Sequence, residues 1–192
     1  MQELKERIRK EGKVLPGNII KVDGFLNHRI DTQLMDHIAE EFGKHFNMDE
    51  VTMILTAEAS GIALSAIVAQ HFHKPMIFAK KAKSDNIEGG LYQSDIFSYT
   101  YKKKVTLLVS KEWMSADDKV LIIDDFMANG EAMRGLCDIV EAAGATLVGI
   151  GCAVEKGFQG GGDRLRAAGV NLHSLAIIES AEPGNIVFRD EN

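Results

Sequence analysis

The segment that most constrains the fold is VLIIDDFMANGEA, residues 120–132. Its four leading apolar residues predict a strand that is buried on both faces, as in a parallel sheet. Two adjacent carboxylates, Asp124 and Asp125, follow at the end of that strand, and a turn of small residues then opens a helix. Because ligands of open α/β folds bind at the carboxyl ends of the strands, the segment predicts a binding site as well as a fold.

The two halves of this segment suit two parts of a sugar phosphate. Asp124 and Asp125 provide acceptors for a vicinal diol. The turn of Ala128, Asn129 and Gly130 presents backbone N–H groups at a helix N-terminus, which is a site for anions. Together they predict a ribose 5-phosphate site. The structural alternative is that Asp125 is a favourable charge at the helix N-terminus and Asp124 a solvated strand end.

The rest of the chain repeats the rhythm of strand, loop, helix and strand, which is typical of a parallel α/β sheet. Strands are predicted near 51–57, 75–79, 120–126, 145–154, 172–178 and 186–188, and helices at 1–11, 32–46, 62–71 and 130–143. Asp31 or Thr32 is expected to cap the second helix. Residues 84–104 interrupt the rhythm and predict a mobile loop leading into a hairpin, with Lys102 to Lys104 at its turn and Ser98 and Tyr99 as lid residues.

Composition excludes several classes of function. The chain has 28 acidic and 22 basic residues, a net charge of −6, which argues against a nucleic-acid partner. Its longest stretch without charged residues, 59–73, is shorter than the roughly 20 apolar residues of a membrane-spanning helix. Cys137 and Cys152 lack metal-ligand spacing and suit a reducing compartment. With no apolar signal segment in residues 1–10, we expect a cytoplasmic protein that contacts no membrane.

Five segments together resemble the type I phosphoribosyltransferases. They are KVDGFLNHRID (21–31), LTAEASGIA (55–63), FAKKAKS (78–84), VLIIDDFMANGEA (120–132) and GCAVEKGFQ (151–159). The resemblance implies one domain, with a parallel α/β core over about 51–155 and a small hood formed by 1–50 and 156–192. It also implies the reaction in which xanthine displaces pyrophosphate from 5-phosphoribosyl-1-pyrophosphate (PRPP), giving xanthosine 5-monophosphate in purine salvage.

The resemblance also assigns roles around PRPP. Asp124 and Asp125 would bind the ribose hydroxyls and stabilise positive charge on the ring. Lys81 would reach the pyrophosphate across a homodimer interface; the alternative is an exposed lysine. Mg²⁺ would enter with PRPP, and no dedicated metal cage is expected. The 5-phosphate would lie on the loop of Ala128, Asn129, Gly130, Glu131 and Ala132, and the pyrophosphate on the loop of Glu58, Ala59, Ser60 and Gly61, whose alternative reading is an ordinary helix cap.

Four residues are expected to bind the purine. Lys156 is a pure donor and therefore suits a 6-oxopurine, while Phe158 would stack on the ring and Ile20 would cover it. Asn27 would reach the 2-substituent, where its amide can donate to the 2-oxo group of xanthine or accept from the amine of guanine. The structural alternative is a surface lysine beside a core aromatic.

Two alternative functions remain open, and one residue departs from the family's loop pattern. The chain could use hypoxanthine or guanine instead of xanthine, or be a PRPP-sensing regulator of the same fold that has lost catalysis. Against the regulator, residues 1–50 contain no evident helix-turn-helix. Glu131 departs from the family's usual Thr-Gly-Gly-Thr loop. Because a carboxylate beside a phosphate is unfavourable unless it turns outward or caps the helix, we expect backbone donors to dominate and Glu131 to point away.

Overall fold

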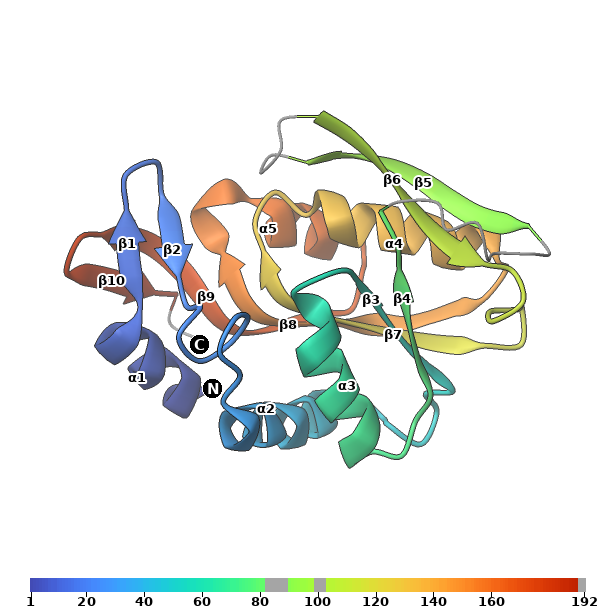
Figure 1. The fold of residues 1–192 in the computed structure, drawn as a ribbon, viewed down its shortest axis with the longest axis horizontal. Helices are drawn as coiled ribbons and strands as arrows, with labels where there is room; N and C mark the ends of the chain where they lie inside the picture. Colours follow the sequence, from blue (N-terminus) through green and yellow to red (C-terminus); the bar gives the residue numbers. More distant parts are fainter. Residues whose placement is uncertain (82–89, 99–102, 190–192) are drawn as a thin grey trace.

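A six-stranded sheet forms the centre of the computed structural model, which describes residues 1–81, 90–98 and 103–189 (Figure 1). Its strand order is β10-β9-β8-β7-β3-β4, and every neighbouring pair is parallel except β10 and β9. The strands are β3 (Met53–Ala57), β4 (Met76–Ala79), β7 (Lys119–Met127), β8 (Thr146–Lys156), β9 (Leu172–Glu182) and β10 (Asn185–Phe188). The predicted parallel α/β fold is therefore confirmed.

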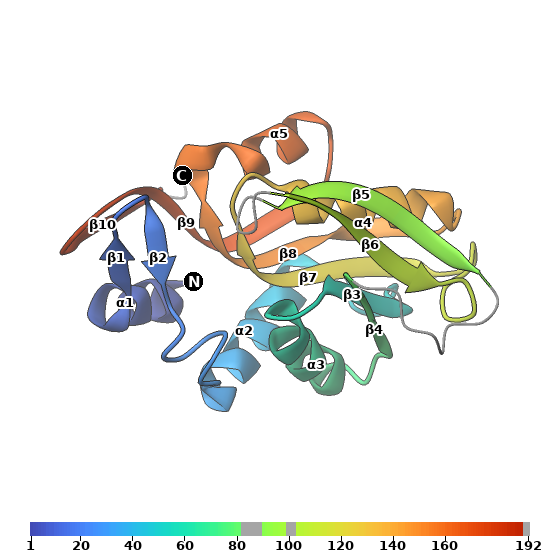
Figure 2. The ribbon, with the colours of Figure 1, turned by 45° about the horizontal axis from the view of Figure 1, so that its top comes forward.

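Helices cover both faces of this sheet. Helices α2 (Thr32–His45) and α3 (Gly61–His71) lie on one face, and α4 (Glu131–Ala142) and the short α5 (Gly161–Ala167) lie on the other (Figure 2). Alternate residues of β7 join the two cores: Leu121 and Ile123 pack with α2 and α3, whereas Val120 and Ile122 pack with α4. This period of two is what a strand buried on both faces requires.

Helix α2 begins where the sequence predicts. The Asp31 carboxylate accepts a hydrogen bond from the backbone N–H of Leu34 at 3.2 Å, so Asp31 is the capping residue. Phe42 of α2 is fully buried in the same cluster as Ile123 of β7. Helix α2 therefore packs on the main sheet, and β9 is one of its strands, although both lie in the segments predicted to form the hood.

Two small antiparallel sheets flank the main one. Near the N-terminus, α1 (Gln2–Glu11) precedes the hairpin of β1 (Lys13–Leu15) and β2 (Ile19–Lys21), and all three lie beside β10 in Figure 1. The second hairpin, β5 (Leu91–Ser98) and β6 (Lys103–Ser110), packs over α4 (Figure 2). It confirms the hairpin predicted in this region, although its second strand extends beyond the prediction to Ser110.

Some expectations fall partly outside the described residues. Most of the predicted loop, Lys102 and the predicted lid residue Tyr99 lie there, while Lys103 and Lys104 begin β6 and pair with β5. Within the described part of the chain, no helix is long and apolar enough to cross a membrane. Cys137 and Cys152 are both free thiols, and only Cys152 is fully buried.

Candidate active site

The acid pair lies inside the sheet and not at a solvated strand end. Strand β7 continues past the pair to Met127, and the exposed fractions of Asp124 and Asp125 are 6% and 1%. A buried carboxylate needs donors that replace its lost water. The structural alternative for Asp124, a solvated strand end, is therefore excluded.

Asp125 brings three distant segments together. Its Oδ2 accepts from the Asn27 side-chain amide at 2.8 Å, and its Oδ1 accepts from the Ser60 hydroxyl at 2.8 Å. Ser60 precedes α3 and makes no capping hydrogen bond with its side chain. Ser60 is therefore the N-cap residue of α3 by position, but its hydroxyl donates to Asp125 and does not cap the helix.

Asp124 faces the start of α3. Its Oδ1 accepts from the backbone N–H of Asp125 at 3.0 Å. Burial raises the pKa of the Asp124 carboxyl well above its ordinary value, and the neighbouring charge of Asp125 raises it further. A Cβ on Gly61 would collide with this carboxylate and with the Thr56 hydroxyl, so only glycine lets α3 start so close to the acid.

A cavity of about 320 Å³ opens at the carboxyl ends of β3 and β7. It is lined by the end of β3 and the loop after it, by Lys81 just after β4, by strand β5, by the end of β7 with the turn that follows, by the start of α4, and by the last residue of β8. The predicted residues that line it are Ser60, Lys81, Asp124, Ala128, Asn129, Gly130, Glu131, Ala132 and Lys156. Ala59, Asp125, Ile20, Asn27 and Phe158 are not among its lining residues.

The loop of residues 128–132, called the phosphate loop below, joins β7 to α4. Gly130 has φ +77°, a left-handed conformation that favours glycine, and α4 begins at the next residue. Helix α5 supports the loop from behind, since the Arg164 guanidinium donates to the carbonyl of Asn129 at 3.0 Å. The loop therefore presents backbone donors of a helix N-terminus to the cavity.

The Glu131 carboxylate points toward the β5–β6 hairpin. It accepts from the Arg134 guanidinium at 3.3 Å and from the backbone N–H of Phe97 at 3.4 Å. Its expected orientation away from the loop agrees with these two contacts.

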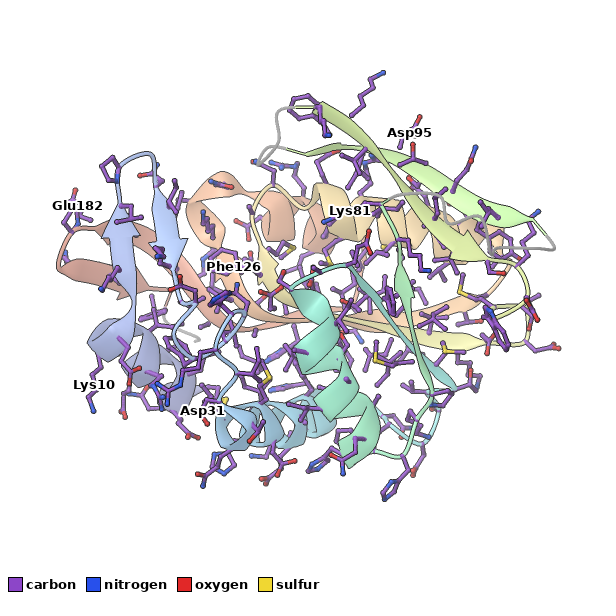
Figure 3. All side chains as sticks on the ribbon, in the orientation of Figure 1. Lys10, Asp31, Lys81, Asp95, Phe126 and Glu182 are labelled. Carbon is purple, nitrogen blue, oxygen red and sulfur yellow. The ribbon has the colours of Figure 1, made fainter. Side chains whose placement is uncertain are left out.

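Glu58 and Ser60 of the pyrophosphate loop predicted from the sequence line the same cavity as the phosphate loop. The Glu58 carboxylate accepts from the backbone N–H of Lys81 at 2.5 Å, which ties this loop to the end of β4. The peptide bond between Glu58 and Ala59 is cis. Figure 3 labels Lys81 near the end of β4.

Lys156 ends β8 and is half-buried at the cavity wall. Its ammonium donates to the carbonyl of Asn18 at 3.0 Å and lies 5.3 Å from the centre of the Phe126 ring. Burial lowers the pKa of this ammonium. Phe126, labelled in Figure 3, lines the cavity and was not singled out from the sequence. Side chains two residues apart on a strand share a face, so Phe126 lies on the same face of β7 as Asp124. This spacing in the sequence could have predicted Phe126 as a site residue.

The other three predicted purine residues lie apart from the cavity. Ile20 is 7% exposed and belongs to the hydrophobic cluster of α2 and α3, against which Phe158 of the short helix η1 (Gly157–Gln159) also packs. The Asn27 amide is occupied by Asp125. Within the described residues, no group of three or more His, Cys, Asp or Glu side chains is placed to hold a metal ion.

A parallel sheet with buried acids, a helix N-terminal loop and a lysine around one cavity defines a class of α/β proteins that bind a phosphorylated ligand at the carboxyl ends of their strands. The chain belongs to the phosphoribosyltransferase family, since the phosphoribosyl transferase domain model matches residues 22–166.

Its full-length relatives identify the branch of that family. The chain is 54% identical to the xanthine phosphoribosyltransferase of Bifidobacterium animalis subsp. lactis, over 98% of this chain and 100% of the relative. It is 52% identical to the xanthine phosphoribosyltransferase of Lachnoclostridium phytofermentans, over 100% of both chains.

Solved structures with the same fold are more distant in sequence. The adenine phosphoribosyltransferase of Giardia lamblia, complexed with 9-deazaadenine, has a TM-score of 0.77 at 21% identity, covering 90% of this chain and 96% of that one. The enzyme of Trypanosoma brucei, in complex with AMP, pyrophosphate and ribose-5-phosphate, has a TM-score of 0.73 at 21% identity, covering 90% and 78%. These similarities establish the fold.

Proposed function

We propose that the protein transfers the phosphoribosyl group of PRPP to xanthine, giving xanthosine 5-monophosphate and pyrophosphate in purine salvage. Relatives named xanthine phosphoribosyltransferase match essentially the whole chain at 50% identity and above. The observation that carries the proposal is the convergence of Asp124, the phosphate loop and Lys156 on one cavity. These groups suit the ribose, the 5-phosphate and a 6-oxopurine respectively.

The proposed mechanism is a dissociative displacement without a covalent nucleophile. The 5-phosphate binds the backbone N–H groups of the phosphate loop, which places the ribose over Asp124 and Asp125. As the bond to pyrophosphate lengthens, positive charge develops on the ribose ring, and the two carboxylates stabilise it. Because the pair is buried, a negative charge on it acts with little screening by water.

The leaving pyrophosphate is proposed to lie on Ala59 and Ser60, with Lys81 as its cation. The substrate is PRPP with its Mg²⁺, which neutralises part of the pyrophosphate charge. Ser60 and Lys81 both line the cavity that the phosphate loop also lines. This arrangement orients the departing group away from the attacking base.

The purine is proposed to lie against Phe126, with its 6-oxo group accepting from Lys156. Ile20 and Phe158 would close over the base from the side of the hood. For Asn27 to donate to the 2-oxo group of xanthine, its amide must give up the hydrogen bond to Asp125 and form one to the base. In the free state the Asp125 oxygens thus keep hydrogen-bond donors until the substrates bring new partners.

The remaining proposals concern organisation. We propose a single domain with a hood, a cytoplasmic location and a homodimer. In support of the dimer, β4 is the outermost strand on its side of the sheet and leads into Lys81. Beside it Phe78 and Trp113 are 38% and 61% exposed. Light scattering tests the dimer, and Phe78→Asp is expected to dissociate it, whereas a monomeric wild-type protein contradicts it.

A panel of purines tests the reaction. Xanthine, guanine and hypoxanthine are supplied in turn with PRPP and Mg²⁺, and nucleotide and pyrophosphate are measured. We expect the highest kcat/KM with xanthine. Preference for hypoxanthine or guanine favours the first alternative, while tight PRPP binding without pyrophosphate release for any purine favours the regulator.

A further inference from the structure

We propose that Arg134 is a positioning residue for the 5-phosphate site, because it holds the Glu131 carboxylate away from the phosphate loop and against the β5–β6 hairpin. The inference rests on the proposed function, in which that loop binds the phosphate of PRPP. It concerns a pair of residues on α4, one inside the loop and one a turn beyond it.

Glu131 creates the difficulty that Arg134 resolves. It is the first residue of α4, it belongs to the phosphate loop, and it lines the cavity. A helix N-terminus attracts carboxylates as it attracts phosphates. An unrestrained Glu131 side chain is therefore an internal competitor for the donors that the 5-phosphate needs, and its charge repels the phosphate as well.

Arg134 holds this carboxylate through a shared network. One guanidinium nitrogen, Nη2, donates to Glu131 Oε2 at 3.3 Å and to the carbonyl of Asp95 at 2.8 Å. The other, Nη1, donates to Asp138 Oδ2 at 2.7 Å. A planar group with several donors can serve these three acceptors at once, whereas a lysine offers only a point charge. Figure 3 shows Asp95 on the hairpin, above α4.

The hairpin supplies the rest of the restraint. The backbone N–H of Phe97 donates to the same Glu131 oxygen, at 3.4 Å. The Ser94 hydroxyl donates to Asp138 Oδ2 at 2.7 Å, so strand β5 is joined to α4 on both sides of Arg134. The carboxylate thus has one donor on α4, Arg134, and one on the hairpin, Phe97, and both lie outside the phosphate loop.

Four proteins test the proposal: wild type, Arg134→Gln, Glu131→Gln and the double variant. The KM for PRPP and kcat with xanthine are measured, together with the Kd for ribose 5-phosphate. Arg134→Gln is expected to raise the PRPP KM and the ribose 5-phosphate Kd about threefold to fivefold with little change in kcat, the size of one exposed ion pair. Adding Glu131→Gln removes the competing charge, so the double variant is expected to regain the values of Glu131→Gln alone.

Two further variants act as controls. Arg134→Lys keeps the charge with a single nitrogen and is expected to give an intermediate KM. Lys44→Gln removes a comparable exposed pair, Lys44 with Glu41 three residues earlier on α2, and is expected to leave both constants unchanged.

Two results overturn the proposal: an unchanged PRPP KM in Arg134→Gln, or a double variant as weak as Arg134→Gln. The second result means that Arg134 acts through the hairpin or on the phosphate directly. Failure of the proposed function looks different, because wild type then neither turns over PRPP with a purine nor binds ribose 5-phosphate. If wild type binds ribose 5-phosphate without turnover, the Kd comparison alone decides the role of Arg134.

Discussion

Gly161 offers a test of how α5 supports the phosphate loop. A Cβ at this position would lie 2.6 Å from the carbonyl carbon of Asn129 and 2.6 Å from the nitrogen of Gly130, and closer still to the Ala128 carbonyl oxygen. All three are backbone atoms, which cannot rotate away as a flexible side chain can. Gly161→Ala must therefore displace either α5 or the loop.

The size of the effect follows from this overlap. Forcing one extra carbon into a packed site lowers the free energy of unfolding by about 1–3 kcal/mol. Because the displaced atoms belong to the proposed 5-phosphate site, the backbone N–H groups of residues 128–132 no longer point at the phosphate position. A displacement of up to about 1 Å is expected to lower kcat/KM for PRPP by about 10- to 100-fold.

Urea unfolding and steady-state kinetics with varied PRPP measure the two effects. The matched control is Gly24→Ala, since a Cβ there meets nothing within 4 Å, and both measurements are expected to stay at wild-type values. If Gly161→Ala loses stability but keeps its kcat/KM for PRPP, either α5 alone has shifted or residues 128–132 do not bind the phosphate, and the expected coupling between α5 and the site is refuted. If it loses neither, the packing of α5 against the loop is refuted.

Three further substitutions test other parts of the site. Asp125→Asn leaves one of the two donors to this side chain without an acceptor and removes a charge, so kcat/KM is expected to fall by about 10- to 100-fold; an unchanged value removes Asp125 from the site. Lys156→Ala is expected to raise the KM for xanthine much more than that for PRPP, and equal increases would contradict its base-reading role. Arg166→Ala leaves the fully buried Glu155 carboxylate without its cation, and urea unfolding should show a loss of about 3 kcal/mol; wild-type stability would mean that the pair is not formed.

Much of the fold could be predicted because its signals are local. The alternation of β7 between two cores, the Asp31 cap of α2 and the glycine before α4 each depend on a few neighbouring residues. The phosphate loop was predictable for the same reason, since strand, turn and helix start are continuous in the chain. Phe126 was accessible to the same reasoning, because it lies two residues after Asp124 on one strand face.

Contacts between distant segments could not be predicted in this way. The sequence suggested Asn27 as a purine ligand, yet its amide is bound to Asp125, 98 residues away. Ser60 was expected at the pyrophosphate and donates to the same carboxylate. Both of these hydrogen bonds to Asp125 depend on how the segment before α2, the loop before α3 and strand β7 pack together.

The sequence by itself determined the α/β rhythm, the acid pair and the loop that follows it, because hydrophobic period, small residues and helix-start residues act within a few positions of one another. Only the tertiary structure decided which groups satisfy Asp125 and which donors hold the Glu131 carboxylate. A buried carboxylate must exchange water for protein donors, and folding selects the donors by bringing distant segments into contact. At Asp125 and Glu131, these donors determine how the carboxylates are held in the site.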